Sequence, residues 1–183
     1  MKATGIVRRI DELGRIVIPK EIRRTLRLRD GDPLEIYTDK HGEVILKKYS
    51  PIGDLSDFAA EYAESASDIL GSATVITDTD HVIAVSGGAL RNIKDKRISR
   101  QIEEAIQTRS SQILTERSKV YPIADEDHHS MDYNSQIVVP IVSQGYPIGS
   151  VIMMSKASEE EFTERELKAA EVGAAFLARQ MDN

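Results

Sequence analysis

The sequence contains no cysteine and no tryptophan, and only 5% of its 183 residues are aromatic. Without cysteine the chain can form neither disulfides nor thiolate zinc sites, so its stability has to come from packing or self-association. The scarcity of aromatic side chains disfavours a stacking platform for single-stranded nucleic acid. No apolar run is long enough to span a membrane, and the N-terminus lacks a signal-peptide core, which together predict a cytoplasmic protein without a membrane partner.

The sequence also lacks the motifs of an enzyme active site. Gly87-Gly88 fits neither the dinucleotide-binding nor the P-loop pattern, and no serine lies in a nucleophile elbow. His128 and His129 lie in the acidic segment 125–134, but adjacent side chains on a loop point apart and rarely chelate one ion, which favours a solvated loop over a metal site. We therefore predict no catalysis, no metal and no cofactor.

Charge is distributed unevenly along the chain. Residues 1–29 carry nine basic and three acidic side chains, although the whole chain has a net charge of −6. Residues 51–183 carry 12 basic and 22 acidic side chains, so this part would repel DNA. An asymmetry of this kind indicates a polyanion partner for the N-terminal end, and we predict double-stranded DNA.

A short helix is predicted from Pro19 to Leu26, because proline is favoured at the first helical position. At 100° per residue one arc of this helix is basic and another is apolar. A charge run on a short helix is usually only its solvated face, but such faces alternate in sign and this one contains no acid. The basic arc consists of Lys20, Arg23, Arg24 and Arg27.

Short β-branched and apolar runs around this helix predict four strands, at 4–10, 15–18, 34–38 and 43–48. The first two are separated by a hinge that contains Gly14. A head of about fifty residues without disulfides or metal buries little surface, so we expect it to dimerise.

Residues 2–49, with the strings TGIVR, DELGRIVIP, EIRRTL and LEIY, resemble the AbrB-like swapped-hairpin DNA-binding domain of bacterial transition-state regulators. The resemblance implies that two chains exchange hairpins into one β-barrel, and that arginines from strand, hinge and helix bind DNA. The basic residues of that family match Arg8, Arg15, Arg23 and Arg24, with Arg9 at an adjacent site. Together with the helix arc, the predicted DNA-binding set is Arg8, Arg9, Arg15, Lys20, Arg23, Arg24 and Arg27.

The rest of the chain predicts a second domain. Composition changes at a predicted linker, residues 51–55, and residues 56–183 read as an α+β body around an antiparallel sheet. Its hairpin VVPI…G.PIGSVI is similar to the closing hairpin of GAF domains, which are small-molecule sensors, so a small-molecule effector is a candidate partner. Predicted elements are helices at 55–70 and 98–108, strands at 72–78, 81–86, 112–115, 119–124, 136–143 and 147–155, and a last helix with Thr163 and Glu166 in capping-box spacing.

Two apolar stripes of this body predict self-association through a four-helix bundle between chains. Combined with a dimeric head, this contact gives a homotetramer, a dimer of dimers. The alternative is that both stripes cover the body's own sheet. The stripes consist of Leu55, Ala59, Tyr62, Ala66 and Ile69, and of Leu167, Ala170, Ala174, Leu177 and Met181, with Ala169, Val172 and Phe176 as a second apolar edge.

The whole chain, with its long acidic C-terminal part, resembles regulators that activate and repress late sporulation transcription. A second hypothesis is an antitoxin, because some swapped-hairpin proteins bind DNA and neutralise a toxin with their C-terminal segment. Those segments are typically short and disordered, whereas this one has the periodicity of a folded domain. We therefore predict a DNA-binding regulator.

Overall fold

The computed structural model describes residues 5–88, 90–125, 132–156 and 161–181 and divides the chain into two compact units. We call Met1–Tyr49 the head and Ser50–Asn183 the body. The segment predicted as a linker differs from that expectation, because it forms helix α2 (Pro51–Asp54) with Ile52 fully buried in the body. The Ser50 hydroxyl caps this helix by accepting a hydrogen bond from the backbone N–H of Gly53 at 3.1 Å.

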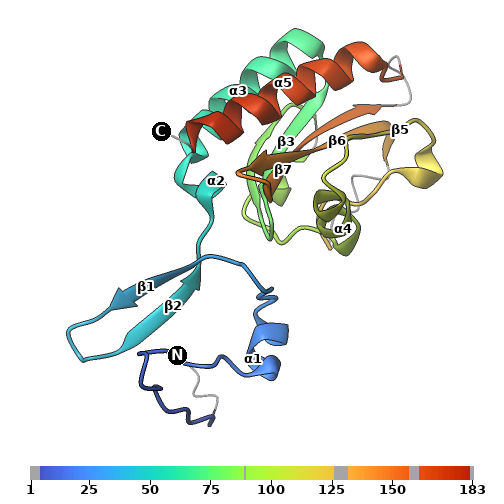
Figure 1. Cartoon of the computed structure of the whole chain (residues 1–183). Helices are drawn as coiled ribbons and strands as arrows, with labels where there is room; N and C mark the ends of the chain where they lie inside the picture. Colours follow the sequence, from blue (N-terminus) through green and yellow to red (C-terminus); the bar gives the residue numbers. More distant parts are fainter. Residues whose placement is uncertain (1–4, 89, 126–131, 157–160, 182–183) are drawn as a thin grey trace. The chain divides into compact units, whose positions relative to one another are not determined.

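The head contains one helix and one hairpin, drawn in blue and cyan in Figure 1. Helix α1 (Lys20–Thr25) follows Pro19, and strands β1 (Leu34–Thr38) and β2 (Val44–Lys48) pair antiparallel. Asp39 closes the turn between the strands, since its Oδ1 accepts the backbone N–H groups of His41 and Glu43. The predictions of this helix and this hairpin are confirmed.

The predicted strands at 4–10 and 15–18 are wrong for the single chain, because the described residues 5–19 include no strand. A strand needs a neighbour for its backbone hydrogen bonds, and the head offers these segments none. Their apolar side chains lie open, with exposed fractions of 83% for Val7 and 73% for both Leu13 and Val17. None of the described head residues is buried, so the head of a single chain has no core.

The body is built on one antiparallel sheet with the strand order β4-β3-β7-β6-β5. The segment 119–124 was predicted as a strand but does not form one. The side-chain amide of Gln136 instead bonds both the backbone N–H and the backbone carbonyl of Tyr121. The strands are β3 (Ala73–Asp78), β4 (Val82–Ser86), β5 (Gln112–Leu114), β6 (Tyr133–Ser143) and β7 (Tyr146–Lys156).

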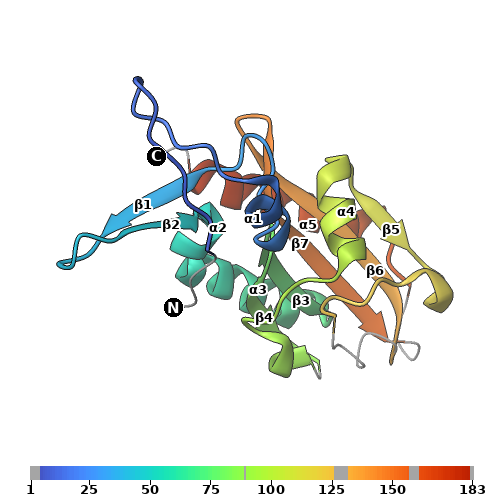
Figure 2. The ribbon, with the colours of Figure 1, turned by 90° about the horizontal axis from the view of Figure 1, so that it is seen from below.

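Helices cover both faces of this sheet (Figure 1 and Figure 2). Helices α3 (Ser56–Leu70) and α5 (Glu164–Gln180) lie side by side on one face, and α4 (Arg100–Thr108) lies on the other. Alternation along the strands supplies two apolar cores. On the α3/α5 side Ile76, Val139 and Met153 pack against the helices, and on the α4 side Val75, Val138 and Ile152 pack against Ile102 and Ile106.

Helix α5 begins with the predicted capping box, which is confirmed. The Thr163 hydroxyl accepts a hydrogen bond from the backbone N–H of Arg165 at 3.3 Å, and the Glu166 carboxylate accepts the backbone N–H of Thr163 at 2.8 Å. A hydrogen bond from the Thr163 hydroxyl to this carboxylate holds the pKa of Glu166 below its usual value. This local network fixes the start of α5.

Helices α3 and α5 approach closely at Gly173. A Cβ atom at this position would overlap the ring of Tyr62, whose hydroxyl donates to the Ala169 carbonyl at 3.2 Å. Burial raises the pKa of Tyr62 to about 12. We expect Gly173→Ala to lower the free energy of unfolding by about 1 to 3 kcal/mol, because the ring has to move out of a packed site. Urea denaturation of the full chain measures this.

The control for this prediction uses the partner side chain. In a Tyr62→Ala background the ring is gone, so Gly173→Ala should instead stabilise the chain slightly, since alanine is the better helix former. If Gly173→Ala had the same effect in both backgrounds, the close approach of the two helices would not be its cause.

Candidate nucleic-acid interface

Helix α1 ends in a turn that changes the predicted basic arc. The backbone N–H of Arg27 bonds the Arg24 carbonyl at 3.3 Å, and that of Leu28 bonds the Arg23 carbonyl at 2.8 Å, which is a Schellman motif. Arg27 therefore lies beyond the helix, in the left-handed conformation with φ 51°, a position that usually carries glycine. Its assignment to the helix face is wrong, although Arg27 remains a cation beside the helix end.

The other three basic residues of the arc do lie on α1. Lys20 and Arg24 are exposed, and Arg23 is half-buried. Arg23 Nη1 donates to Asp30 Oδ1 at 2.8 Å, while Arg23 Nε is buried without a hydrogen-bond partner among the described residues. Arginines in the last turn also interact favourably with the helix dipole.

The hinge of the head is organised by Asp11. Its Oδ1 accepts the backbone N–H groups of Leu13 at 3.0 Å and Arg15 at 2.8 Å, and its Oδ2 accepts Arg15 Nε at 3.2 Å. Gly14 completes the turn with φ 74°. This network uses Nε of Arg15 and leaves its side chain 67% exposed, so the hinge presents a guanidinium to solvent.

The remaining predicted cations, Arg8 and Arg9, are exposed in the segment before the hinge. All seven predicted DNA-binding residues thus lie in the head, and none of them is buried. The predicted site did not include Asp11 and Asp30, which hold two of the arginines. Their signals are the string DELG at the hinge and the turn RDGDP after the helix, since aspartate in turns bonds nearby groups.

Most side chains of the two stripes predicted to form an oligomer contact lie inside the body and not on its surface. Six of their ten side chains are buried in the body's own core, because the α3/α5 face of the sheet needs this apolar cover. The alternative that the stripes cover their own sheet is correct for these six, while Leu55 and Met181 are half-buried. The six are Ala59, Ala66, Leu167, Ala170, Ala174 and Leu177.

A second apolar surface lies on the outside of the same two helices. Its exposed fractions are 44% for Phe58, 81% for Ile69, 69% for Val172 and 44% for Phe176. Tyr62 is half-buried and lies on the same side of α3, because it follows Phe58 by four residues, about one helical turn. We call these five residues the outer face.

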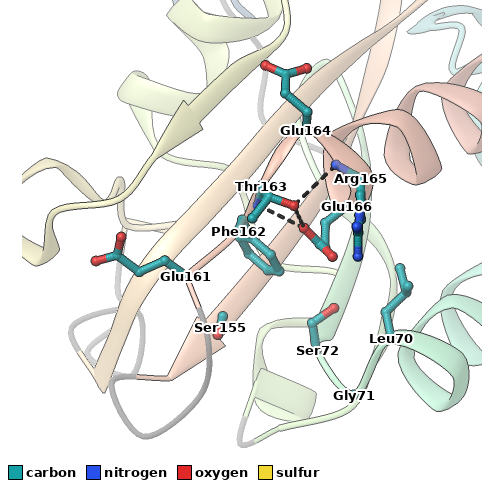
Figure 3. A pocket seen from close by; sticks show the side chains of 10 residues that line it. All are labelled: Leu70, Gly71, Ser72, Ser155, Glu161, Phe162, Thr163, Glu164, Arg165 and Glu166. Carbon is teal, nitrogen blue, oxygen red and sulfur yellow. Dashed lines mark hydrogen bonds between the residues drawn. The ribbon is translucent and has the colours of Figure 1, made fainter.

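A pocket of about 600 Å³ lies where α3 ends and α5 begins (Figure 3). Leu70 and Phe162 are its apolar lining. Charged side chains of both signs also line it, namely Glu161, Glu164, Arg165 and Glu166. The Ser72 hydroxyl is buried and has no hydrogen-bond partner among the described residues. On the opposite face of the sheet, apolar side chains fill the space under α4.

The described residues form neither a metal site nor a membrane-spanning helix. Within the described ranges no three His, Asp or Glu side chains come together to hold a metal ion. His128 and His129 lie outside these ranges. Among the described helices, none combines the length and the apolar character needed to cross a bilayer.

The body matches a known family over most of the chain. Residues 54–182 match the family described as stage V sporulation protein T C-terminal, transcription factor. The chain is 53% identical over 182 residues to stage V sporulation protein T of Bacillus subtilis (strain 168), covering 100% of this chain and 99% of that protein.

The head has relatives of its own. The chain is 56% identical over 63 residues to the transition state regulatory protein AbrB of Bacillus subtilis (strain 168), covering 31% of this chain and 65% of that protein. Residues 7–54 match the family described as antidote-toxin recognition MazE, bacterial antitoxin.

Solved GAF domains share the fold of the body. One is the GAF domain of a phosphoenolpyruvate-protein phosphotransferase from Acinetobacter, with a TM-score of 0.58 at 16% identity, covering 70% of this chain and 82% of that one. Another is the cofactor-binding GAF domain of the nutrient sensor CodY from Clostridium difficile, with a TM-score of 0.54 at 17% identity. This match covers 67% of this chain and 85% of that one. The predicted α+β fold with a GAF-like body is confirmed.

Proposed function

The chain belongs to the stage V sporulation protein T family, and we infer that it regulates transcription of late sporulation genes by binding double-stranded DNA through its head. The observation that carries the DNA-binding role is the set of seven unburied cations in the AbrB-like head. A body with a net charge of −10 would be repelled by phosphate, so contact with DNA falls to the head. Such a regulator acts in the cytoplasm and is not an enzyme.

The test is a fluorescence-anisotropy titration of labelled duplex DNA with the intact chain. Binding that weakens steeply with added salt supports the proposal, because lysine and arginine contacts to phosphate release counterions. A chain that leaves duplex DNA unbound at low salt would contradict it. A basic surface built from hinge and helix arginines reads DNA shape as well as base edges, so we expect degenerate sites.

We also propose that the chain works as a tetramer with two kinds of contact. Open apolar side chains at 5–18 support pairing of two heads, which would give these segments their missing strand neighbours. The outer face supports a second contact, since neighbouring exposed apolar residues on two packed helices suit a four-helix bundle with another chain. Paired heads would raise avidity for weak clustered sites.

We also propose that the body binds a small-molecule effector. Support comes from the pocket under the start of α5, where a buried, unpartnered Ser72 hydroxyl meets an apolar lining. The related fold of the nutrient sensor CodY is described as cofactor-binding.

An antitoxin is the second candidate, because residues 7–54 match the MazE family. The body argues against it. Its antiparallel sheet with two apolar cores is a folded domain, whereas the toxin-binding segments of such antitoxins are typically short and disordered.

A further inference from the structure

Two arginines of the proposed DNA-binding set are paired with acids in the free chain, and the two pairs are built differently. Asp11 bonds the backbone of the hinge as well as the side chain of Arg15. Asp30 bonds only Arg23 among the described residues, and its side chain is 96% exposed. Asp11 therefore supports the local fold, whereas Asp30 only occupies a guanidinium.

Arg23 is held in place independently of Asp30. Its side chain is 41% exposed, and its Nε is buried, so the guanidinium keeps one edge against the head while Nη1 reaches the carboxylate at 2.8 Å. A phosphate that binds Nη1 has to displace Asp30, because both ligands are anions that need the same N–H groups. The displaced carboxylate stays near the phosphate and repels it.

We propose that Asp30 is an internal competitor for DNA phosphate at Arg23, and that it lowers the DNA affinity of the head. This inference rests on the proposed DNA-binding function. Asp11 has the opposite role, since it positions Arg15 by ordering the hinge. An exposed ion pair is weak and is screened by salt, so phosphate can displace the Asp30 carboxylate while the competition still reduces affinity.

The test compares full-length variants in a fluorescence-anisotropy titration with one labelled duplex at about 100 mM salt. Asp30→Asn should bind about 3- to 10-fold more tightly, since two carboxylates are removed per dimeric head. Asp11→Ala should bind more weakly than wild type, because the hinge loses the acceptor for its backbone N–H groups. Circular dichroism confirms that each variant is folded.

Glu43→Gln is the matched control for charge. Glu43 lies at the β1–β2 turn, where its backbone N–H bonds Asp39, and its side chain is exposed. This variant removes the same charge from the head as Asp30→Asn but should leave affinity within about twofold of wild type. An equal gain in Glu43→Gln would show a general charge effect and overturn the proposal.

A double-mutant cycle isolates the contact. In an Arg23→Ala background Asp30→Asn should lose most of its gain, because the competed guanidinium is absent. If Asp30→Asn raised DNA affinity equally in the Arg23→Ala background, or did not raise it in the wild-type background, the competitor role would be overturned. DNA binding by the wild-type chain would still support the proposed function. Failure of the wild-type chain to bind DNA would instead reject the proposed function, and this inference with it.

Discussion

Replacing Arg23 and Arg24 together with alanine should weaken binding of the intact chain to duplex DNA by about a thousandfold at 100 mM salt. The two side chains lie in the last turn of α1, and the proposed dimeric head would present four of them. Each phosphate contact releases condensed counterions, so the loss of about four of the roughly eight contacts expected for a dimer removes about half of the electrostatic contribution to the binding free energy. Thermal stability should change little, since neither arginine is buried.

Lys94→Ala with Arg100→Ala is the control for this loss. This double substitution removes the same number of positive charges, but from exposed positions of the body instead of the head. Its DNA affinity should remain close to that of wild type. Undiminished binding by the Arg23→Ala, Arg24→Ala chain would show that helix α1 does not contact DNA.

Phe176→Glu should convert the tetramer into a dimer. The phenyl ring lies on the outer face and is 44% exposed, so a carboxylate there leaves the fold of the body intact but places charge in the proposed contact between chains. Light scattering should show a mass of about 82 kDa for wild type, four times the 20.4-kDa chain, and about 41 kDa for the variant.

Two further substitutions sharpen this prediction. Gln101→Glu, at an exposed position on α4 across the sheet, should leave the tetramer intact. Leu177→Glu, next to Phe176 in sequence, should instead unfold the body, because Leu177 is fully buried in the core and an unpaired buried carboxylate costs several kcal/mol. A wild-type dimer, or a tetramer that survives Phe176→Glu, would remove the outer face from the proposal.

Local signals in the sequence predicted the elements that a single chain can complete by itself. Pro19 marks the start of α1, turn residues mark the β1–β2 hairpin, and the spacing of Thr163 and Glu166 marks the start of α5. Each rests on hydrogen bonds between residues close in the chain, so the sequence alone could predict it.

The errors arose where a second surface decides the outcome. The segments 4–10 and 15–18 have strand-like composition, but in one chain they have no strand beside them. The stripes on α3 and α5 have bundle-like spacing, but the sheet takes up the stripe that contains Ala170 and Leu177 and leaves Phe176 outside. Helical periodicity identifies an apolar face without telling what covers it.

The acids beside two of the predicted DNA-binding arginines were absent from the prediction for a related reason. Asp30 is seven residues from Arg23, and only the left-handed turn at Arg27 brings the two side chains together. The turn RDGDP marks Asp30 as a turn residue, but a left-handed turn at a non-glycine residue has no simple sequence signal. The pairing of Asp30 with Arg23 therefore became visible only in three dimensions.

The salt dependence of DNA binding by the intact chain tests the central claim most directly. If each head of a dimer neutralises about four phosphates, a plot of log affinity against log salt concentration should have a slope near −7, which is about 10⁴ in affinity between 50 and 200 mM salt. A slope between zero and about −2 would mean that the cations of the head do not carry the binding, and would contradict the account.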